Sequence, residues 1–206
     1  MRKQFVLDNN KEIMSRKNEF ERKTKETEIT GILNLEGSGK TAIRSGIGFL
    51  DHMLDLLAFH SGFDLELTCK GDLEVCAHHS VEDIALTLGE AFLAALGDKK
   101  GIQRYAHCFL PMDETLSRTV IDISGRPYHV FKGEFFTENI GTLPTEMIKH
   151  FFCSFSLTSK TTLHQEILYG ENDHHKAESL FKGLGKCLVQ AVEIVSDKVP
   201  SSKGVL

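Results

Sequence analysis

Apolar residues recur along the chain with two different periods, and these periods predict the order of secondary structure. Alternation of apolar and polar residues is typical of half-buried strands, whereas steps of three and four residues are typical of helices with one apolar face. Alternation and apolar content predict strands at residues 28–35, 40–45, 63–69, 117–124, 128–132 and 161–168. The longer steps predict helices at about residues 49–57, 81–96, 144–156 and 176–195.

The predicted elements occur twice in one order: strand, strand, helix, strand, helix. This repetition predicts an α+β fold of two tandem half-domains related by a pseudo-twofold axis. Each half is expected to be a small mixed sheet with two helices on one face. We place the halves at residues 19–100 and 101–206, after an N-terminal arm of residues 1–18.

Composition changes this picture little. The chain has 206 residues and a net charge of −5, which argues against nucleic-acid binding because that function needs a basic face. No apolar run reaches the roughly 18 residues of a transmembrane helix, and the N-terminus lacks the apolar core of a signal peptide. We therefore expect a cytoplasmic protein without a membrane partner. Five widely spaced cysteines without a C-x-x-C motif predict reduced thiols.

The strongest chemical evidence comes from the histidines, because six of the ten belong to a constellation that both halves repeat. Each half has a lone histidine in its first predicted helix, then an adjacent pair, then a glutamate three residues after the pair. The lone histidine precedes the pair by 26 residues in one half and by 24 in the other. The two sets are His52, His78, His79 and Glu82, and His150, His174, His175 and Glu178.

Imidazole and carboxylate groups at these spacings predict metal binding. One adjacent pair alone would more often be a capping or surface feature, so the repetition of the whole pattern decides the interpretation. Residues three or four apart share a helix face, so each glutamate can meet one histidine of its pair. Adjacent histidines on a helix point about 100° apart, so one ion cannot easily take both. Eight ligands then suit two ions with open positions. The ligand type favours Mn²⁺, Fe²⁺ or Zn²⁺ over Cu(I) without selecting one of the three, and we favour Mn²⁺.

Several basic and hydroxyl residues lie in turns or near the second metal motif. Together they could hold a phosphate group, although each one alone is more often a solvated surface residue. These candidates are Arg104, Arg126, Lys182, Ser201, Ser202 and Lys203. The histidines outside the repeated constellation are expected to be mostly structural: His60, His107, His129 and His164.

Taken together, these residues resemble the imidazoleglycerol-phosphate dehydratase family. The resemblance runs from about Glu19 to the C-terminus. It rests on RKTKET (22–27), GIGFLDHML (46–54), HHSVED (78–83), PMDE (111–114), DISGRP (122–127), GENDHHKAESLFK (170–182) and the SSKG tail (201–204). The resemblance implies repeats of a ferredoxin-like or ribosomal-protein-S5-domain-2-like unit. It also implies two Mn²⁺ ions per site and a shell of twenty-four copies with active sites at subunit interfaces.

The resemblance also implies roles for individual residues. One ion would be held by His52, His79, His174 and Glu178, and the other by His78, Glu82, His150 and His175. Substrate contacts would be Glu26, the weaker candidate His60 and the phosphate-holding residues named above. The catalytic carboxylates would come from Glu26, Glu82 and Glu178. One position departs from the family, which usually has an acidic residue before the first histidine pair where this chain has Cys76 and Ala77; its loss could loosen metal binding.

The implied reaction is dehydration of D-erythro-imidazole glycerol phosphate to imidazole acetol phosphate in histidine biosynthesis, by a carbon–oxygen lyase. The proton to be removed is not next to a carbonyl group. We therefore hypothesise that the substrate ring, held by two metals, relays electrons as an imidazolate while Glu26 shuttles the proton. Two alternatives remain open. A dinuclear metal-dependent phosphatase would use more aspartate ligands and release phosphate, whereas a non-catalytic metal-binding shell protein would not need the phosphate-holding residues.

Overall fold

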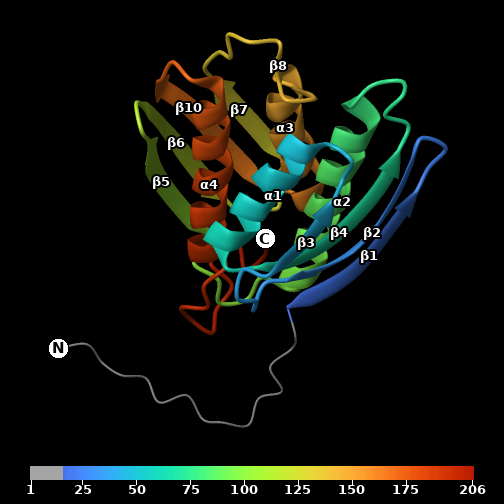
Figure 1. The fold of residues 1–206 in the computed structure, drawn as a ribbon. Coiled ribbons are helices and arrows are strands. Elements are labelled where there is room, and N and C mark those ends of the chain that lie inside the picture. The colour runs from blue at the N-terminus through green and yellow to red at the C-terminus, as the bar shows by residue number, and fades with distance from the viewer. Residues whose placement is uncertain (1–15) are drawn as a thin grey trace.

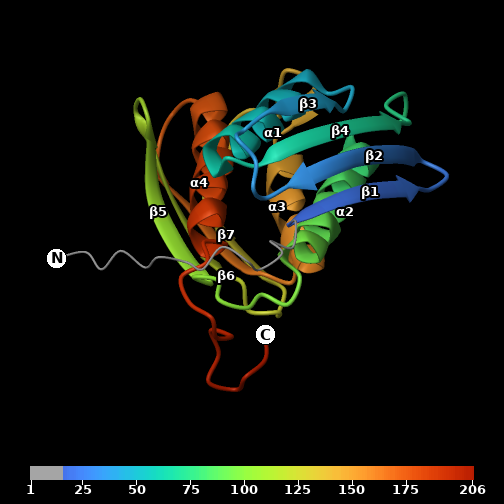
Figure 2. The ribbon, with the colours of Figure 1, turned by 90° about the horizontal axis from the view of Figure 1, so that it is seen from below.

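The computed structural model describes residues 16–206 as two β-sheets with a layer of helices between them (Figures 1 and 2). The first half contains β1 (Lys17–Lys23), β2 (Thr27–Asn34), β3 (Thr41–Arg44), α1 (Gly48–Ser61), β4 (Asp64–Gly71) and α2 (His78–Leu96). The second half contains β5 (Tyr105–Met112), β6 (Thr115–Asp122), β7 (Tyr128–Lys132), β8 (Asn139–Ile140), β9 (Leu143–Pro144), α3 (Glu146–Ser159), β10 (Thr162–Tyr169) and α4 (Asp173–Ala191).

The two halves have the same sheet topology. Their strand orders are β1-β2-β4-β3 and β5-β6-β10-β7, and the small β8–β9 hairpin is inserted before α3. The last pair of each sheet is parallel and is joined by a helical crossover, α1 in the first half and α3 in the second. The other neighbours are antiparallel. The predicted α+β fold of tandem half-domains is therefore confirmed.

The helices of one half pack against those of the other. Helix α1 lies against α4, and α2 lies against α3, while each sheet is covered on one face by the two helices of its own half. The buried ring of Phe92 on α2 packs against Phe155 on α3, across the boundary between the halves, whereas Phe151, Phe152 and Phe181 form a buried aromatic cluster within the second half. Each helix pair thus brings together residues from both repeats.

Each sheet also has a strand that the apolar pattern did not predict. Strand β1, with the sequence KNEFERK, holds a single apolar residue, Phe20. It lies at the edge of its sheet, where charged side chains protect the free backbone groups from pairing with other chains. Strand β5 is the equivalent edge strand of the second half. The expectation of three strands per half was wrong because edge strands need not alternate clearly.

The helices that carry the histidine pairs begin earlier than expected. Helix α2 begins at His78 and α4 at Asp173, instead of about residues 81 and 176. The side chain of Asn172 caps α4 by accepting hydrogen bonds from the backbone N–H groups of His174 and His175. Both histidine pairs therefore lie in the first turn of a helix, where their polar side chains interrupt the apolar period.

The structure describes only part of the N-terminal arm that was predicted from the sequence. Strand β1 begins at Lys17, so the predicted arm (1–18) overlaps it by two residues, and residues 1–15 lie outside the described part of the chain. The division between residues 100 and 101 falls in the connection between α2 and β5, and we retain it as a proposal.

Among residues 16–206, no helix is long and apolar enough to cross a membrane. All five cysteines are free thiols.

Candidate metal centre

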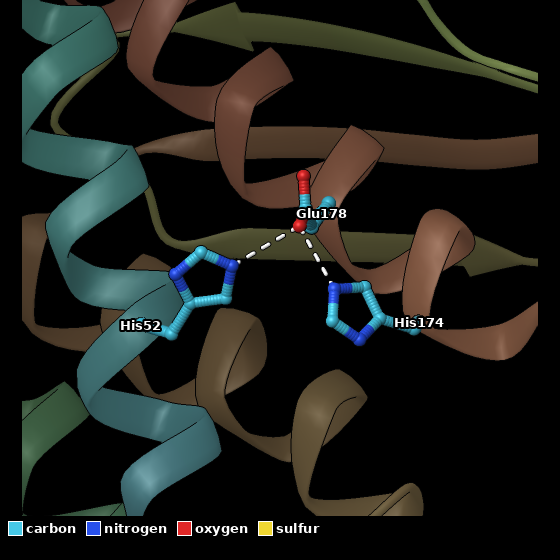
Figure 3. Close-up of side chains that lie close together, drawn as sticks. All are labelled: His52, His174 and Glu178. Carbon is cyan, nitrogen blue, oxygen red and sulfur yellow. Dashed lines mark hydrogen bonds and ion pairs between the residues drawn. The ribbon is translucent and has the colours of Figure 1, made fainter.

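The pairing of α1 with α4 forms the first cluster of ligands, made of His52, His174 and Glu178 (Figure 3). The Nε2 atoms of His52 and His174 lie 3.1 and 2.8 Å from the same carboxylate oxygen, Oε1 of Glu178. The two histidine side chains are nearly half exposed, at 46% and 44%, whereas Glu178 is buried. An ion held here would have ligands on its protein side and open positions on its solvent side.

The pairing of α2 with α3 forms the second cluster in the same way. His150 Nε2 lies 3.1 Å from Oε1 of Glu82, and His78 Nε2 lies 4.0 Å from Oε2 of the same residue. The ring centroids of His78 and His150 are 4.8 Å apart. Each cluster thus combines the lone histidine of one half with a histidine and a glutamate of the other half. Two imidazole nitrogens and one carboxylate oxygen, without a thiolate, fit Mn²⁺, Fe²⁺ or Zn²⁺.

Glu178 is strongly favoured in its ionised form. Burial would raise its pKa, but the neighbouring Lys182, His174 and His52 outweigh burial and lower the pKa to about 2. Lys182 forms an ion pair with the carboxylate from one helical turn away. The first cluster therefore offers a metal ion an anionic oxygen at neutral pH.

The second histidine of each pair lies outside both clusters. His79 Nδ1 lies 3.0 Å from Asp72 Oδ2, and His175 Nδ1 lies 2.7 Å from Glu114 Oε2. The hydrogen bond to Asp72 raises the pKa of His79. A carboxylate at Nδ1 fixes the orientation of the ring and leaves Nε2 as the atom that can bind a metal. The structure therefore brings together three members of each implied four-ligand set within one subunit.

Asp72 also bears on the departure at Cys76 and Ala77. Cys76 is exposed, but the missing acidic residue does not leave His79 without a carboxylate partner, because Asp72 in the loop after β4 supplies one. In the second half, Glu114 accepts from the backbone N–H of Asn172 as well as bonding His175, and these contacts lower its pKa. Our sequence interpretation gave no role to either carboxylate.

The implied phosphate-holding residues form two separate groups. Arg104 is buried and forms a two-pronged ion pair with Asp122, with Nε–Oδ1 and Nη2–Oδ2 distances of 2.7 and 3.2 Å. It also donates a 2.8 Å hydrogen bond to the carbonyl of Pro200, so it anchors the C-terminal tail. Arg126 is exposed, and the neighbouring Gly125, with φ of 73°, packs against Leu206. Arg104, Arg126 and the tail that holds Ser201, Ser202 and Lys203 thus share one end of the second sheet.

This tail group lies far from the histidines within one subunit. Asp122 ends the eight-residue strand β6, whereas Thr115 begins it next to Glu114, the partner of His175. At about 3.4 Å per residue, the two ends are about 24 Å apart. Lys182, in contrast, forms an ion pair with Glu178. His60 lies near Lys182 as well, and its pKa is lowered by burial and by the charges of Lys186 and Lys182. No small substrate can touch the histidine pair and the tail of the same subunit.

The fold and the two clusters define a tandem-repeat α+β protein with paired histidine–carboxylate sites. The sequence model for imidazoleglycerol-phosphate dehydratase matches residues 45–188. A relative of that name from Clostridioides difficile (strain 630) is 57% identical over 186 residues, which cover 90% of this chain and 97% of the relative. Another, from Clostridium botulinum (strain Alaska E43 / Type E3), is 57% identical over 188 residues, or 91% and 96% of the two chains.

Solved structures agree with the sequence comparison. The imidazoleglycerol-phosphate dehydratase of Staphylococcus aureus subsp. aureus N315 superimposes with a TM-score of 0.79 at 35% identity, covering 87% of this chain and 99% of that one. The Pyrococcus furiosus enzyme, in complex with (S)-C348, gives 0.77 at 35% identity, covering 91% and 100%. The chain belongs to the imidazoleglycerol-phosphate dehydratase family. It is accordingly a hydro-lyase of histidine biosynthesis, which confirms the predicted family and enzyme class.

Proposed function

We propose that this chain converts D-erythro-imidazole glycerol phosphate to imidazole acetol phosphate with two metal ions per active site, preferably Mn²⁺ and less favourably Fe²⁺ or Zn²⁺. The family supports the substrate and the reaction. The two three-ligand clusters, each built from both halves, are the observation that supports a metal requirement. The same observation weakens the phosphatase alternative, because the carboxylates of the clusters are glutamates and neither cluster contains the aspartates expected there.

Each cluster would hold one ion, and the second histidine of each pair would complete the sets. The ligands would be His52, His174, Glu178 and His79 for one ion, and His78, Glu82, His150 and His175 for the other. Bound ions would supply Lewis-acid polarisation of the substrate's imidazole. Glu82 and Glu178 then serve as ligands, so the proton-transfer role falls to another carboxylate.

The active site would be shared between copies of the chain. His79 and His175 lie outside the clusters of their own subunit. The tail group lies at the far end of β6, a strand about 24 Å long, from Glu114, the partner of His175. Self-association would bring the fourth ligands and the tail of neighbouring subunits to each pair of clusters. The shell of twenty-four copies and the cytoplasmic location remain predictions from the sequence.

Glu26 is the proposed acid/base. Its side chain is half exposed, and Oε1 lies 3.7 Å from Nε2 of His79, the atom left for a metal. We expect Glu26→Gln to lower kcat by about 10²- to 10⁴-fold, because general acid–base catalysis contributes on that order. Bound Mn²⁺, measured by elemental analysis, should not change. The matched control is Glu28→Gln, an exposed carboxylate on β2; full turnover by Glu26→Gln with both metals bound would remove Glu26 from this role.

Arg126 is expected to bind the phosphate, because it is exposed and lies beside the C-terminal tail. Arg126→Gln should raise KM by at least about tenfold, because the loss of one charge-assisted hydrogen bond weakens substrate binding by about that factor. Steady-state kinetics with Arg44→Gln, an exposed arginine on β3, provides the control. An unchanged KM in Arg126→Gln would place the phosphate elsewhere.

Product analysis tests the reaction itself. The Mn²⁺-loaded protein should form the ketone product from imidazole glycerol phosphate without releasing inorganic phosphate. Phosphate without ketone would identify a phosphatase. Neither product from a folded, metal-loaded protein would support the non-catalytic alternative.

A further inference from the structure

A buried carboxylate, Asp83, ties the turn that holds Glu26 to helix α2. Its side chain faces strands β1 and β2, and the residue is only 7% exposed. Oδ1 of Asp83 accepts from both Nε and Nη2 of Arg22 at 2.9 Å. Oδ2 accepts from Oγ1 of the buried Thr27 at 2.5 Å. One carboxylate therefore contacts the strand before the turn and the strand after it.

The backbone of the turn is fixed as well. Oγ1 of Thr24 accepts from the N–H groups of Glu26 and Thr27 at 3.1 and 2.9 Å. The carbonyl of Glu26 accepts from the N–H of Asp72 at 3.1 Å, and Asp72 also orients His79. The main chain of Glu26 is thus held on both sides, while its carboxylate stays half exposed beside His79.

The second half shows a different solution at the equivalent turn. Thr27 begins β2 and Thr115 begins β6, so Glu114 occupies the position of Glu26. The carboxylate of Glu114 is used to fix its own surroundings, because it accepts from the N–H groups of Glu171 and Asn172 at 3.2 and 2.8 Å in addition to bonding His175.

The equivalent of Asp83 also differs. Both Asp83 and Ser179 stand four residues after the second histidine of a pair, and Ser179 donates its hydroxyl to the carbonyl of Lys176 within its own helix. In the first half, therefore, a separate carboxylate, Asp83, fixes the turn, and the side chain of the turn residue Glu26 stays half exposed. In the other half, the turn glutamate itself makes the fixing contacts.

We propose that Asp83 is a positioning residue for Glu26. Together with Arg22 and Thr27, it fixes the β1–β2 turn so that the Glu26 carboxylate stays beside Nε2 of His79, the place where the substrate's proton is transferred. This inference rests on the proposed function of Glu26. Hydrogen bonds to an ionised carboxylate are among the strongest that a side chain makes, so Asp83 is suited to holding a catalytic group within a narrow range of positions.

The test is a double-mutant cycle between Asp83→Asn and Glu26→Gln. Asparagine keeps the size of the side chain but turns one acceptor into a donor. Asp83→Asn should lower kcat by about 10- to 100-fold, because a displacement of about 1 Å costs on the order of 10² in rate. KM and bound Mn²⁺ should stay unchanged, and Asp83→Asn should cause no further loss in the Glu26→Gln background. Equal losses in both backgrounds, or loss of Mn²⁺ with a raised KM, would overturn the proposal.

A second variant protects the test from a folding failure. Thr27→Val is nearly isosteric and removes the 2.5 Å hydrogen bond to Asp83, so it should show the same dependence on Glu26 with a smaller loss of kcat. Amide hydrogen exchange of the peptide containing residues 24–28 should rise in both variants, independently of turnover. Unchanged exchange and kcat in Thr27→Val would contradict the proposal.

Asp64→Asn is the matched control. Asp64 fixes another turn by accepting from the N–H groups of Ser38 and Lys40, at the opposite end of β4 from the Glu26 turn. Its replacement should leave kcat unchanged, and a loss equal to that of Asp83→Asn would overturn the specific role of Asp83. If the wild-type protein forms no ketone, the dehydratase function fails and the inference fails with it. Active wild type with additive losses rejects the inference alone.

Discussion

Glu178→Gln is expected to lower kcat by at least about 10³-fold and to remove one of the two Mn²⁺ ions per chain. Glu178 supplies the anionic oxygen of the first cluster, and the Nε2 atoms of His52 and His174 converge on it. A neutral amide keeps the size but binds a hard cation weakly. A bound metal contributes several kcal/mol to catalysis, and a 10³-fold loss corresponds to about 4 kcal/mol. Elemental analysis and steady-state kinetics on the same preparation check both parts.

The control for this variant is Glu90→Gln, an exposed carboxylate on α2 that is outside both clusters. It should retain both ions and wild-type kcat. If Glu178→Gln also retained two ions and turned over normally, the first cluster would not be a metal site.

Co-expression of His79→Ala with His174→Ala is expected to restore activity that neither variant has alone. His79 lies outside the cluster of its own subunit, so we expect it to complete the cluster of a neighbour. A His79→Ala subunit keeps an intact cluster, and a His174→Ala subunit keeps the missing His79. With random assembly, about one quarter of the sites should contain both intact parts, because each site needs one particular kind of subunit on either side.

The control pair is His52→Ala with His174→Ala. Both changes fall in the same cluster, so no arrangement of these subunits gives an intact site, and the co-expressed pair should stay inactive. Activity of His79→Ala alone, or no recovery in a co-assembled mixture of His79→Ala and His174→Ala, would contradict sharing of the site.

The sequence predicted most of the fold because the apolar pattern is repeated. The elements that it missed are the edge strands β1 and β5, whose residues do not need to alternate clearly, since an edge strand is exposed along one side. The early starts of α2 and α4 were missed for a related reason. Their first turns are occupied by the histidine pairs, whose polar side chains interrupt the apolar period.

The candidate ligands were predictable from the sequence because the same pattern of histidines and glutamate occurs twice. The angular argument predicted that the members of each pair would not share an ion, and in the structure His78 and His174 lie in clusters while His79 and His175 lie outside them. The direction of the second histidines could not be predicted, because it depends on Asp72 and Glu114, carboxylates that belong to no repeated pattern.

Single charged residues were the least predictable part of the site. The sequence offers Arg104 as one of several candidate phosphate ligands, and it does not show that the guanidinium is bound to Asp122, 18 residues away in sequence, and to the C-terminal tail. Asp83 contacts Arg22 across 61 residues. Such pairs form only when strands and helices meet, so no local spacing reveals them.

The most direct test of the two-metal account is a titration of metal-free protein with Mn²⁺, in which bound metal and ketone formation are measured on the same samples. The account predicts that activity appears only with metal and saturates at two ions per chain, without release of phosphate. Activity in the metal-free protein, or saturation at a single ion per chain, would contradict it.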